Sequence, residues 1–434
     1  MLKIFDFEKM PVVEIVNELL VDASKRGASD IHLDPHEDFM KIRIRIDGNL
    51  IDYAEVPNAI RKNLITRVKI ISGMNITESR LPQDGAIKDT LKDVNLDLRV
   101  SCLPTNLGEK IVIRILDYSL SLSGLEHLGF SEKNYHKVLK MIGAPNGIIL
   151  VTGATGSGKS TTVYSILQRL NREETNIITV EDPIEMNIDG INQVQTNSEI
   201  GLTFASALRS ILRQDPNIIM IGEIRDTETA QIAVRASITG HLVLSTLHTN
   251  DSLTTIERLV DMGVEKYLLS SSLTGIISQK LARKLCPHCK KERPTNDYEK
   301  KLFKKVLNKE VDKVYIAEGC EKCNSGYLGR IAIHEVLMIN EEIKEAISDN
   351  LDREKLRELV YNADVTTLLQ DGLEKVITGL TTVEELLKII ELENDEKEAG
   401  DMNLQVMLDR TDIVNHATPN THVNNIDEIE SIEI

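Results

Sequence analysis

The sequence contains no tryptophan, and aromatic residues make up only 3% of its 434 residues, so its cores must pack from aliphatic side chains. No apolar run approaches the roughly 18 residues that a membrane-spanning helix needs. The first ten residues, MLKIFDFEKM, mix charged and apolar side chains too closely for a secretory leader. We therefore expect a cytoplasmic protein.

Basic residues are outnumbered by acidic ones, which gives a formal charge of −17 and a pI near 5.2. Residues 391–434 hold twelve Asp or Glu and two Lys or Arg, so this segment carries −10 and the preceding 390 residues carry −7. This balance argues against a broad nucleic-acid-binding face, which requires a basic surface, and we expect no direct nucleic-acid partner.

The length exceeds what one hydrophobic core accommodates, and the apolar fraction of 41% is sufficient for two or three packed domains. Residues 1–118 are predicted to form a mixed α/β domain. Its candidate elements are a helix at 11–25, an alternating strand at 40–46 that ends in an Asp47-Gly48 turn, and strands at 94–100 and 110–116. The polar residues 117–124 are the expected linker.

Residues 125–283 show short aliphatic runs that alternate with helical patterns, as in an α/β protein with a buried parallel sheet. The four runs are Gly147–Val151, Asn176–Val180, Asn217–Ile221 and His241–Ser245. The segments that follow are predicted to be a cysteine-bearing insert at 284–330, a mostly helical region at 331–395 and a disordered acidic tail at 396–434.

A phosphate-binding loop follows the first run and precedes a helical pattern. It fits G-x-x-x-x-G-K-[ST] and consists of Gly153, Ala154, Thr155, Gly156, Ser157, Gly158, Lys159 and Ser160, with Thr161 next to it. Glycines allow backbone N–H groups to surround a phosphate, the lysine contacts the β- and γ-phosphates, and the serine hydroxyl is a Mg²⁺ ligand. The motif predicts binding of ATP with Mg²⁺.

Acidic residues end the second and third runs, at Glu181 and Glu223. The carboxyl ends of parallel strands lie at one edge of a sheet, where such groups hold Mg²⁺ or polarise the attacking water. Glu223 stands in the water-polarising position and is, with Ser160, a candidate magnesium ligand. Glu181 is a candidate for the same duties, and the sequence leaves open which is the base. Capping of a following helix is the alternative role for either carboxylate.

His248 lies just beyond the fourth run, in Ser245-Thr246-Leu247-His248-Thr249-Asn250-Asp251. It is a candidate donor to the γ-phosphate, and the alternative is a cap for the next helix. A guanidinium would also stabilise the transferring phosphoryl group. The candidate arginines are Arg43, Arg45, Arg67, Arg80, Arg99, Arg209, Arg213 and Arg225, of which at least one is expected to reach the nucleotide.

Two CxxC pairs, Cys286 with Cys289 and Cys320 with Cys323, are separated by 30 residues. Four thiolates in this pattern predict a structural, tetrahedral Zn²⁺ site with a small subdomain between the pairs. Free or redox-active thiols are the alternative. Cys102 stands apart and is interpreted as a small buried apolar residue.

The combined motifs resemble the secretion ATPase superfamily that powers type IV pilus assembly and type II secretion, over about residues 28–392. The segments that carry the resemblance are Ala28–His32, Arg45–Gly48, Leu81–Gly85, the phosphate-binding loop, Glu181–Glu185, Leu212–Pro216, Gly222–Asp226 and Ser245–Asp251. The resemblance implies a homohexamer with ATP bound between an N-terminal PAS-like domain and a RecA-like P-loop core. It also implies that first-domain arginines, with Arg45 and Arg80 as candidates, complete the site.

The tetracysteine insert and Gly326–Arg330 look like the pilus-assembly and type II secretion branches, because retraction ATPases usually lack the insert. The leading hypothesis is that ATP hydrolysis moves the first domain against the core and pushes on an inner-membrane platform protein, which adds pilin subunits to a pilus. Membrane association would then be peripheral, through partners. The alternatives are type II secretion, pilus retraction or DNA uptake, a nucleotide-gated scaffold with little turnover, and a zinc-ribbon nucleic-acid binder.

Overall fold

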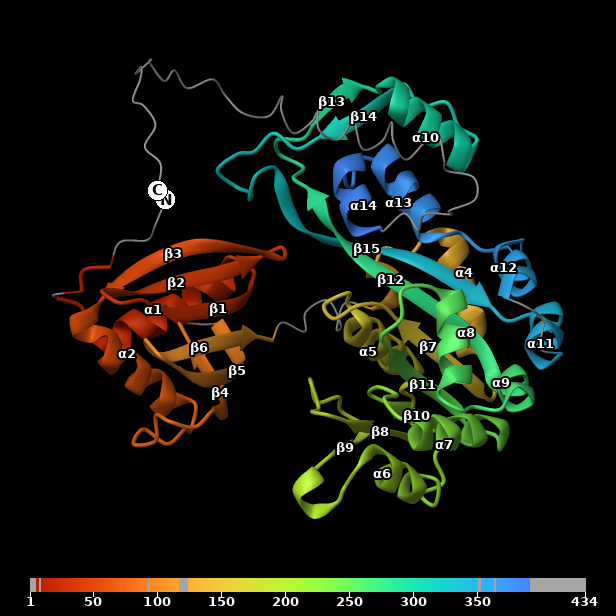
Figure 1. Ribbon diagram of the computed structural model, residues 1–434, viewed down its shortest axis with the longest axis horizontal. Helices are drawn as coiled ribbons and strands as arrows, with labels where there is room; N and C mark the ends of the chain where they lie inside the picture. The colour runs from red at the N-terminus through yellow and green to blue at the C-terminus, as the bar shows by residue number, and fades with distance from the viewer. Residues whose placement is uncertain are drawn as a thin grey trace, which may run out of the picture. The chain divides into compact units, whose positions relative to one another are not determined.

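The computed structural model describes residues 5–7, 9–92, 94–116, 124–349, 353–362 and 364–390 (Figure 1). The predicted acidic tail lies outside the described residues, as does nearly all of the predicted linker. Within the described parts, no helix has both the length and the apolar character needed to cross a membrane.

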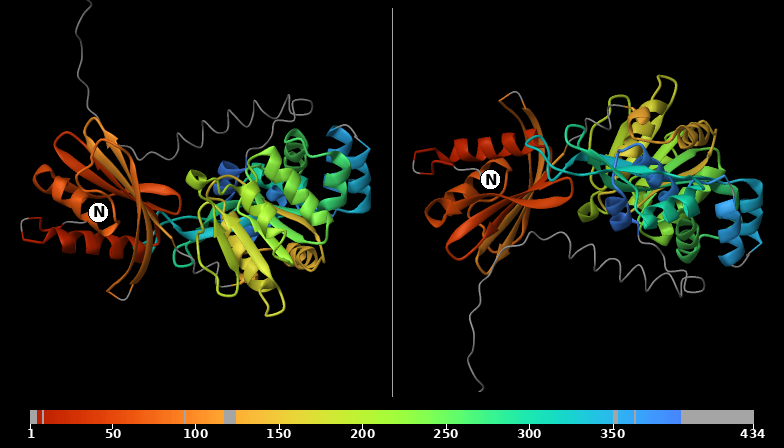
Figure 2. Two further views of the ribbon diagram at one scale, coloured as in Figure 1. Left: turned by 90° about the horizontal axis from the view of Figure 1, so that it is seen from below. Right: turned by 90° about the horizontal axis from the view of Figure 1, so that it is seen from above.

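Residues 5–116 form a six-stranded antiparallel sheet in the order β3-β2-β1-β6-β5-β4. The strands are β1 (Ala28–Pro35), β2 (Phe39–Ile46), β3 (Asn49–Pro57), β4 (Gln83–Leu91), β5 (Val94–Thr105) and β6 (Gly108–Ile115). Helices α1 (Val12–Lys25) and α2 (Asn58–Ile71) cover one face, as Figure 2 shows. Burial alternates along β2, as predicted, because apolar side chains such as Ile42 and Ile44 face the helices.

Residues 124–390 contain a seven-stranded sheet in the order β15-β12-β7-β11-β10-β8-β9, in which all neighbours are parallel except β12 and β15. Its strands are β7 (Gly147–Thr152), β8 (Ile177–Glu181), β9 (Asn192–Gln195), β10 (Ile218–Ile221), β11 (Leu242–Leu247), β12 (Leu273–Leu285) and β15 (Tyr327–Met338). The helices are α4 (Glu132–Ile142), α5 (Lys159–Leu170), α6 (Phe204–Ile211), α7 (Thr227–Ile238), α8 (Ser252–Asp261) and α9 (Lys266–Ser272), with 3-10 turns η1 (Leu125–His127) and η2 (Ser198–Ile200).

The four aliphatic runs overlap the central strands β7, β8, β10 and β11, and every residue of these strands is buried. Alternate side chains enter two different cores: Ile148 and Leu150 of β7 pack in one, whereas Ile149 and Val151 pack in the other. This two-sided burial explains why these segments contain continuous aliphatic runs, and it confirms the predicted α/β class with a parallel sheet.

Strands β12 and β15 were not anticipated by the sequence analysis. They continue the core sheet beyond β7, and the predicted boundaries at 284 and 331 fall within them. The chain between them forms a two-stranded sheet of β13 (Lys291–Pro294) and β14 (Lys313–Ile316) with helix α10 (Asp297–Leu307). The C-terminal helices are α11 (Glu341–Ser348), α12 (Arg353–Asn362), α13 (Leu368–Ile377) and α14 (Val383–Ile389).

Candidate nucleotide site

The phosphate-binding loop runs from the end of β7 to the start of α5 at Lys159. Three of its glycines have positive φ: Gly153 at 146°, Gly156 at 81° and Gly158 at 89°. A Cβ on Gly153 would lie 2.4 Å from the carbonyl oxygen of Gln279, so only glycine fits there. The loop thus reaches the N-terminus of α5, where backbone N–H groups and the helix dipole favour an anion.

Lys159 is buried, and its Nζ donates to the carbonyl oxygens of Gly153 at 2.8 Å and Ala154 at 3.1 Å. Burial lowers the pKa of Lys159, and the negative charge of Glu223 partly offsets this effect. The ammonium is therefore held over its own loop, and it lines the same cavity as Glu223, which follows β10.

Gln279 on β12 is a residue that the sequence analysis missed. Its Nε2 donates to the carbonyl oxygen of Ser157 at 2.7 Å, and its Oε1 accepts from the Thr162 hydroxyl at 2.8 Å. One buried amide thereby ties the loop to the first turn of α5. The available signal was the run Gly275–Ile277 followed by polar Ser278 and Gln279, which resembles the ends of the other strands.

Glu181 is buried, and its carboxylate is surrounded by neutral donors. Its Oε1 accepts from Thr179 at 2.5 Å and from Gln193 at 3.0 Å, and its Oε2 accepts from the Tyr164 hydroxyl. Burial raises the pKa of Tyr164, and the charge of Glu181 raises it further, so the phenol remains a donor. Both carboxylate oxygens of Glu181 are therefore hydrogen-bonded to side chains of residues 164–193.

Glu223 has a different environment, since its partners are cationic or ionisable. Its Oε1 accepts from Arg225 at 2.5 Å, and its Oε2 lies 3.3 Å from Nε2 of His248. Burial alone would raise the pKa of Glu223, but the hydrogen bond and charge of Arg225, with a smaller contribution from His248, hold it below its ordinary value. Glu223 therefore stays ionised.

The helix caps are provided by other residues. The side chain of Asp226 accepts from Thr229 N at the start of α7, and that of Asp251 accepts from Thr254 N at the start of α8. Glu223 and His248 are thus available for another role. Together with Lys159 and Ser160 they line one cavity, and Glu181 also contributes to its wall.

The predicted arginines differ in their partners. Arg45 on β2 donates to the Gly48 carbonyl oxygen at 2.8 Å and lies 3.5 Å from Asp30. Arg80 is paired with Glu78 at 3.0 Å, and its side chain is 86% exposed. In the core, Arg225 contacts Glu223, whereas Arg209 pairs with Glu228.

The four predicted cysteines lie together, with their sulfurs within 4.8 Å of one another. The Sγ–Sγ distances are 3.9 Å for Cys286 and Cys320, and 3.7 Å for both Cys289 with Cys323 and Cys320 with Cys323. A tetrahedral ion with metal–sulfur bonds of about 2.3 Å separates its sulfurs by about 3.8 Å. The cluster therefore fits a four-coordinate metal ion.

Comparison with known proteins gives a consistent assignment. Residues 6–388 match the family described as type II/IV secretion system protein. The chain is 46% identical over 380 residues to the type II secretion system ATPase E of Vibrio cholerae serotype O1, which covers 87% of this chain and 75% of that protein. It is also 46% identical over 381 residues to the type IV pilus assembly ATPase PilB of Myxococcus xanthus, which covers 87% of this chain and 67% of that protein.

Among solved structures, the crystal structure of the pilus retraction motor PilT with bound ADP is similar, with a TM-score of 0.60 and 28% identity. The similarity covers 86% of this chain and 96% of the retraction motor.

Replacement of Gln279 by Leu is expected to weaken ATP binding about tenfold, because it leaves the Ser157 carbonyl and the Thr162 hydroxyl unpaired. Titration calorimetry with ATP measures this change. Gln231→Leu is the matched control, since Gln231 lies on α7 and its amide donates to the Gly263 carbonyl oxygen in an exposed hydrogen bond. Equal affinities in the parent and Gln279→Leu would contradict the assigned role.

Proposed function

Because the chain is an ATP hydrolase that belongs to the type II/IV secretion system protein family, we propose that it is the motor of a filament-assembly machine in the membrane. In this proposal, ATP hydrolysis drives the addition of pilin-type subunits to a type IV pilus, and a type II secretion filament is the second candidate. Relatives of 46% identity carry both names, and this supports the two candidates equally.

One observation carries the proposal most: Glu223 lies 3.3 Å from His248 and lines the same cavity as Lys159 at the carboxyl edge of the sheet. We assign Lys159 to the β- and γ-phosphates, His248 to the γ-phosphate, and Glu223 to the attacking water. A carboxylate kept ionised by Arg225 accepts hydrogen bonds from that water and orients it for in-line attack. Glu181 accepts hydrogen bonds from neutral donors at both oxygens, and its role would be to hold the carboxyl end of β8 in place.

Magnesium would be held by the Ser160 hydroxyl and the Glu223 carboxylate, since both are oxygen ligands that line the same cavity. Bound there, it would neutralise charge that develops on the phosphate oxygens. The loop residues from Gly153 to Thr161 would supply backbone and hydroxyl contacts to the nucleotide.

A first-domain arginine would complete the site. Of the two candidates, Arg45 is bonded to the Gly48 carbonyl and Asp30, whereas Arg80 has a largely exposed guanidinium. This difference favours Arg80 as the residue that reaches a γ-phosphate. The assignment presumes the homohexamer that the family resemblance implies, in which ATP lies between the first domain and a core.

The motor would work at the cytoplasmic face of the membrane, recruited by an inner-membrane platform protein and without direct contact to nucleic acid. Hydrolysis would move the first domain against the core, and the platform protein would transmit this motion to the filament base. We assign Zn²⁺ to the four-cysteine cluster, where its role would be structural because thiolates fill all four positions.

Lys159→Ala is expected to abolish ATP hydrolysis, with a fall in kcat of at least on the order of a hundredfold, because a preorganised charge on the phosphates is lost. A steady-state phosphate-release assay measures kcat. Lys140→Ala is the control, because Lys140 lies exposed on α4. Equal rates in parent and Lys159→Ala would refute the assigned site. An inactive parent, tested with membranes that contain the machine, would favour the scaffold alternative.

Metal analysis of protein purified without chelators or affinity metals is expected to give about one zinc per chain. Cys286→Ser should reduce this content, because one of four ligands is lost. Cys102→Ser, outside the cluster, should retain it. Parent protein that contains no metal under reducing conditions would instead support free thiols.

Deletion of the gene is expected to eliminate surface pili, and the parent gene but not Lys159→Ala should restore them. Pili are counted by electron microscopy, while culture supernatants are compared for secreted proteins. Intact pili with a missing secreted protein would assign the motor to type II secretion. An excess of pili would identify a retraction motor and reject assembly.

A further inference from the structure

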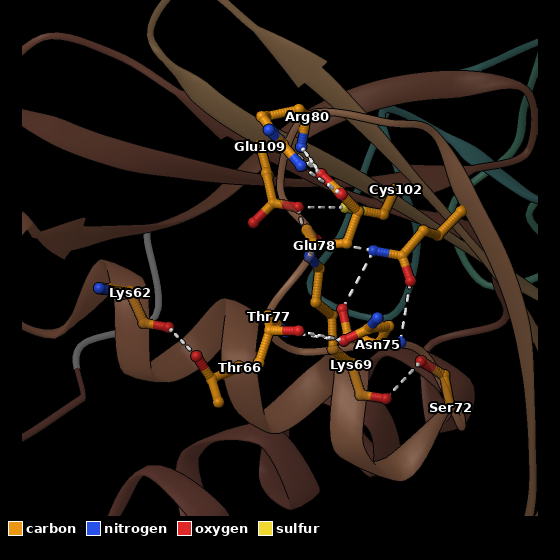
Figure 3. A network of polar contacts seen from close by, with 11 residues as sticks. Lys62, Thr66, Lys69, Ser72, Asn75, Thr77, Glu78, Arg80, Cys102 and Glu109 are labelled. Carbon is orange, nitrogen blue, oxygen red and sulfur yellow. Dashed lines mark hydrogen bonds and ion pairs between the residues drawn. The ribbon is translucent and has the colours of Figure 1, made fainter.

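The segment between α2 and β4 carries Arg80 and is held by a network of polar contacts (Figure 3). It begins at Ser72, which closes α2, and ends at Gln83, the first residue of β4. Arg80 itself projects to solvent, so its position depends on the backbone that carries it. We call residues 73–82 the Arg80 loop.

A buried lysine lies under this loop. The side chain of Lys69 is 2% exposed, and its Nζ donates to the Glu78 carbonyl oxygen at 2.7 Å and forms an ion pair with Glu109 on β6. Burial of a charge costs free energy, and an apolar side chain in such a place is often at least as stabilising. The lysine makes two directional contacts, to the Glu78 carbonyl and to Glu109, that an apolar residue could not make.

The surroundings of Glu109 show that the ion pair is built into the domain. The Cys102 thiol on β5 donates to Glu109 Oε1 at 3.3 Å. Burial, together with the bond and charge of Glu109, raises the pKa of Cys102 to about 12, so this thiol remains a donor at neutral pH. Lys69 and Cys102 thus both face the same carboxylate.

A second support acts at the same carbonyl group. Gln83 Nε2 donates to the Glu78 carbonyl oxygen at 2.8 Å and to that of Asn75 at 3.1 Å. Gln83 Oε1 accepts from Asn75 N at 2.8 Å. The loop is therefore bonded near its beginning and near Glu78, and the Glu78 carbonyl receives both the ammonium of Lys69 and the amide of Gln83.

Glu78 transmits this placement to Arg80. Its Oε1 accepts from the backbone N of Arg80 at 2.7 Å and from Nε of Arg80 at 3.2 Å. Its Oε2 accepts from Nη2 of Arg80 at 3.0 Å. The backbone of Glu78 is thus fixed by Lys69, and its carboxylate fixes both the backbone and the side chain of Arg80.

We propose that Lys69 is a positioning residue for ATP hydrolysis, which acts by fixing Glu78 and so presents the guanidinium of Arg80 in one orientation. The proposal rests on the assigned role of Arg80. Oxygens of the transferred phosphoryl group would accept the guanidinium hydrogen bonds that Glu78 accepts in this structure. The bonds from Lys69 and Gln83 to the Glu78 carbonyl would keep the loop backbone unchanged. A misplaced arginine loses most of its effect, because stabilisation of the transition state requires close alignment.

The test compares Lys69→Met with Lys62→Met in the full-length chain. Methionine keeps much of the length of Lys69 without its charge, whereas Lys62 lies exposed on the same helix, where its carbonyl accepts from Thr66. Lys69→Met is expected to lower kcat for ATP hydrolysis by on the order of tenfold to a hundredfold. The KM for ATP should stay within about twofold, because the phosphate-binding loop is unaltered. Lys62→Met should match the parent.

A double-mutant cycle with Arg80→Ala separates positioning from general damage to the domain. If Lys69 acts through Arg80, then Arg80→Ala alone lowers kcat and adding Lys69→Met has no further effect. A further fall of the same size in the Arg80→Ala background would overturn the positioning role while leaving that of Arg80 intact. An unchanged kcat in Arg80→Ala would reject the role assigned to Arg80 itself, and the positioning role with it.

Gln83→Met provides an independent variant if Lys69→Met does not fold, as judged by its thermal melting and assembly state. It removes the second bond to the Glu78 carbonyl, and Gln83 is only partly buried. The same lowered kcat, and the same absence of any effect in the Arg80→Ala background, are expected. Parent-like kinetics in this variant, with Arg80→Ala impaired, would show that the loop needs no such support.

Discussion

Parallel pairing of the central strands is the constraint on which the candidate site depends. Register places Ile221 beside Val180 on one side and beside Ser245 on the other, and Leu247 pairs with Thr152. The residues that follow these positions must therefore emerge along a single edge, where the phosphate-binding loop also begins. The two apolar cores that cover the faces of the sheet keep this edge in place, because each strand is buried on both sides.

The same edge gives its two glutamates different chemical environments. Glu181 is surrounded by hydroxyl and amide donors, while Glu223 contacts a guanidinium and an imidazole and shares a cavity with the lysine of the phosphate-binding loop. Hydrogen bonds from any donor favour an ionised carboxylate, but at Glu223 the positive charge of Arg225 adds to this effect. The two glutamates thus share a residue type but not a set of neighbours, and the roles proposed for them follow from that difference.

Strand β12 connects this edge to the cysteine cluster. It carries Gln279, which holds the phosphate-binding loop, and it ends at Leu285, directly before Cys286. The Cys286 backbone N donates to Gly326 O, next to the start of β15, at 2.9 Å. Arg283 pairs with Glu385 on α14, so this C-terminal helix is held to the same strand. A metal ion in the cluster would therefore link the end of β12 to the start of β15.

Local signals were sufficient to predict several elements from the sequence: the glycine loop, the aliphatic strands, the acidic and histidine strand ends, and the two cysteine pairs. Each is a short run whose residue types are dictated by backbone geometry, burial or ligand chemistry. The folded chain was needed to show that β12 and β15 extend the core sheet and that Gln279 holds the phosphate-binding loop, because the residues in contact lie far apart in the sequence. Paired residues of β12 and β15 are separated by about 40 to 60 positions, and Gln279 and Ser157 by more than a hundred. Lys69 shows the same limit, since a lysine in an amphipathic helix indicates an exposed face. Its burial depends on Glu109, Cys102 and a loop carbonyl that meet it only in the folded domain.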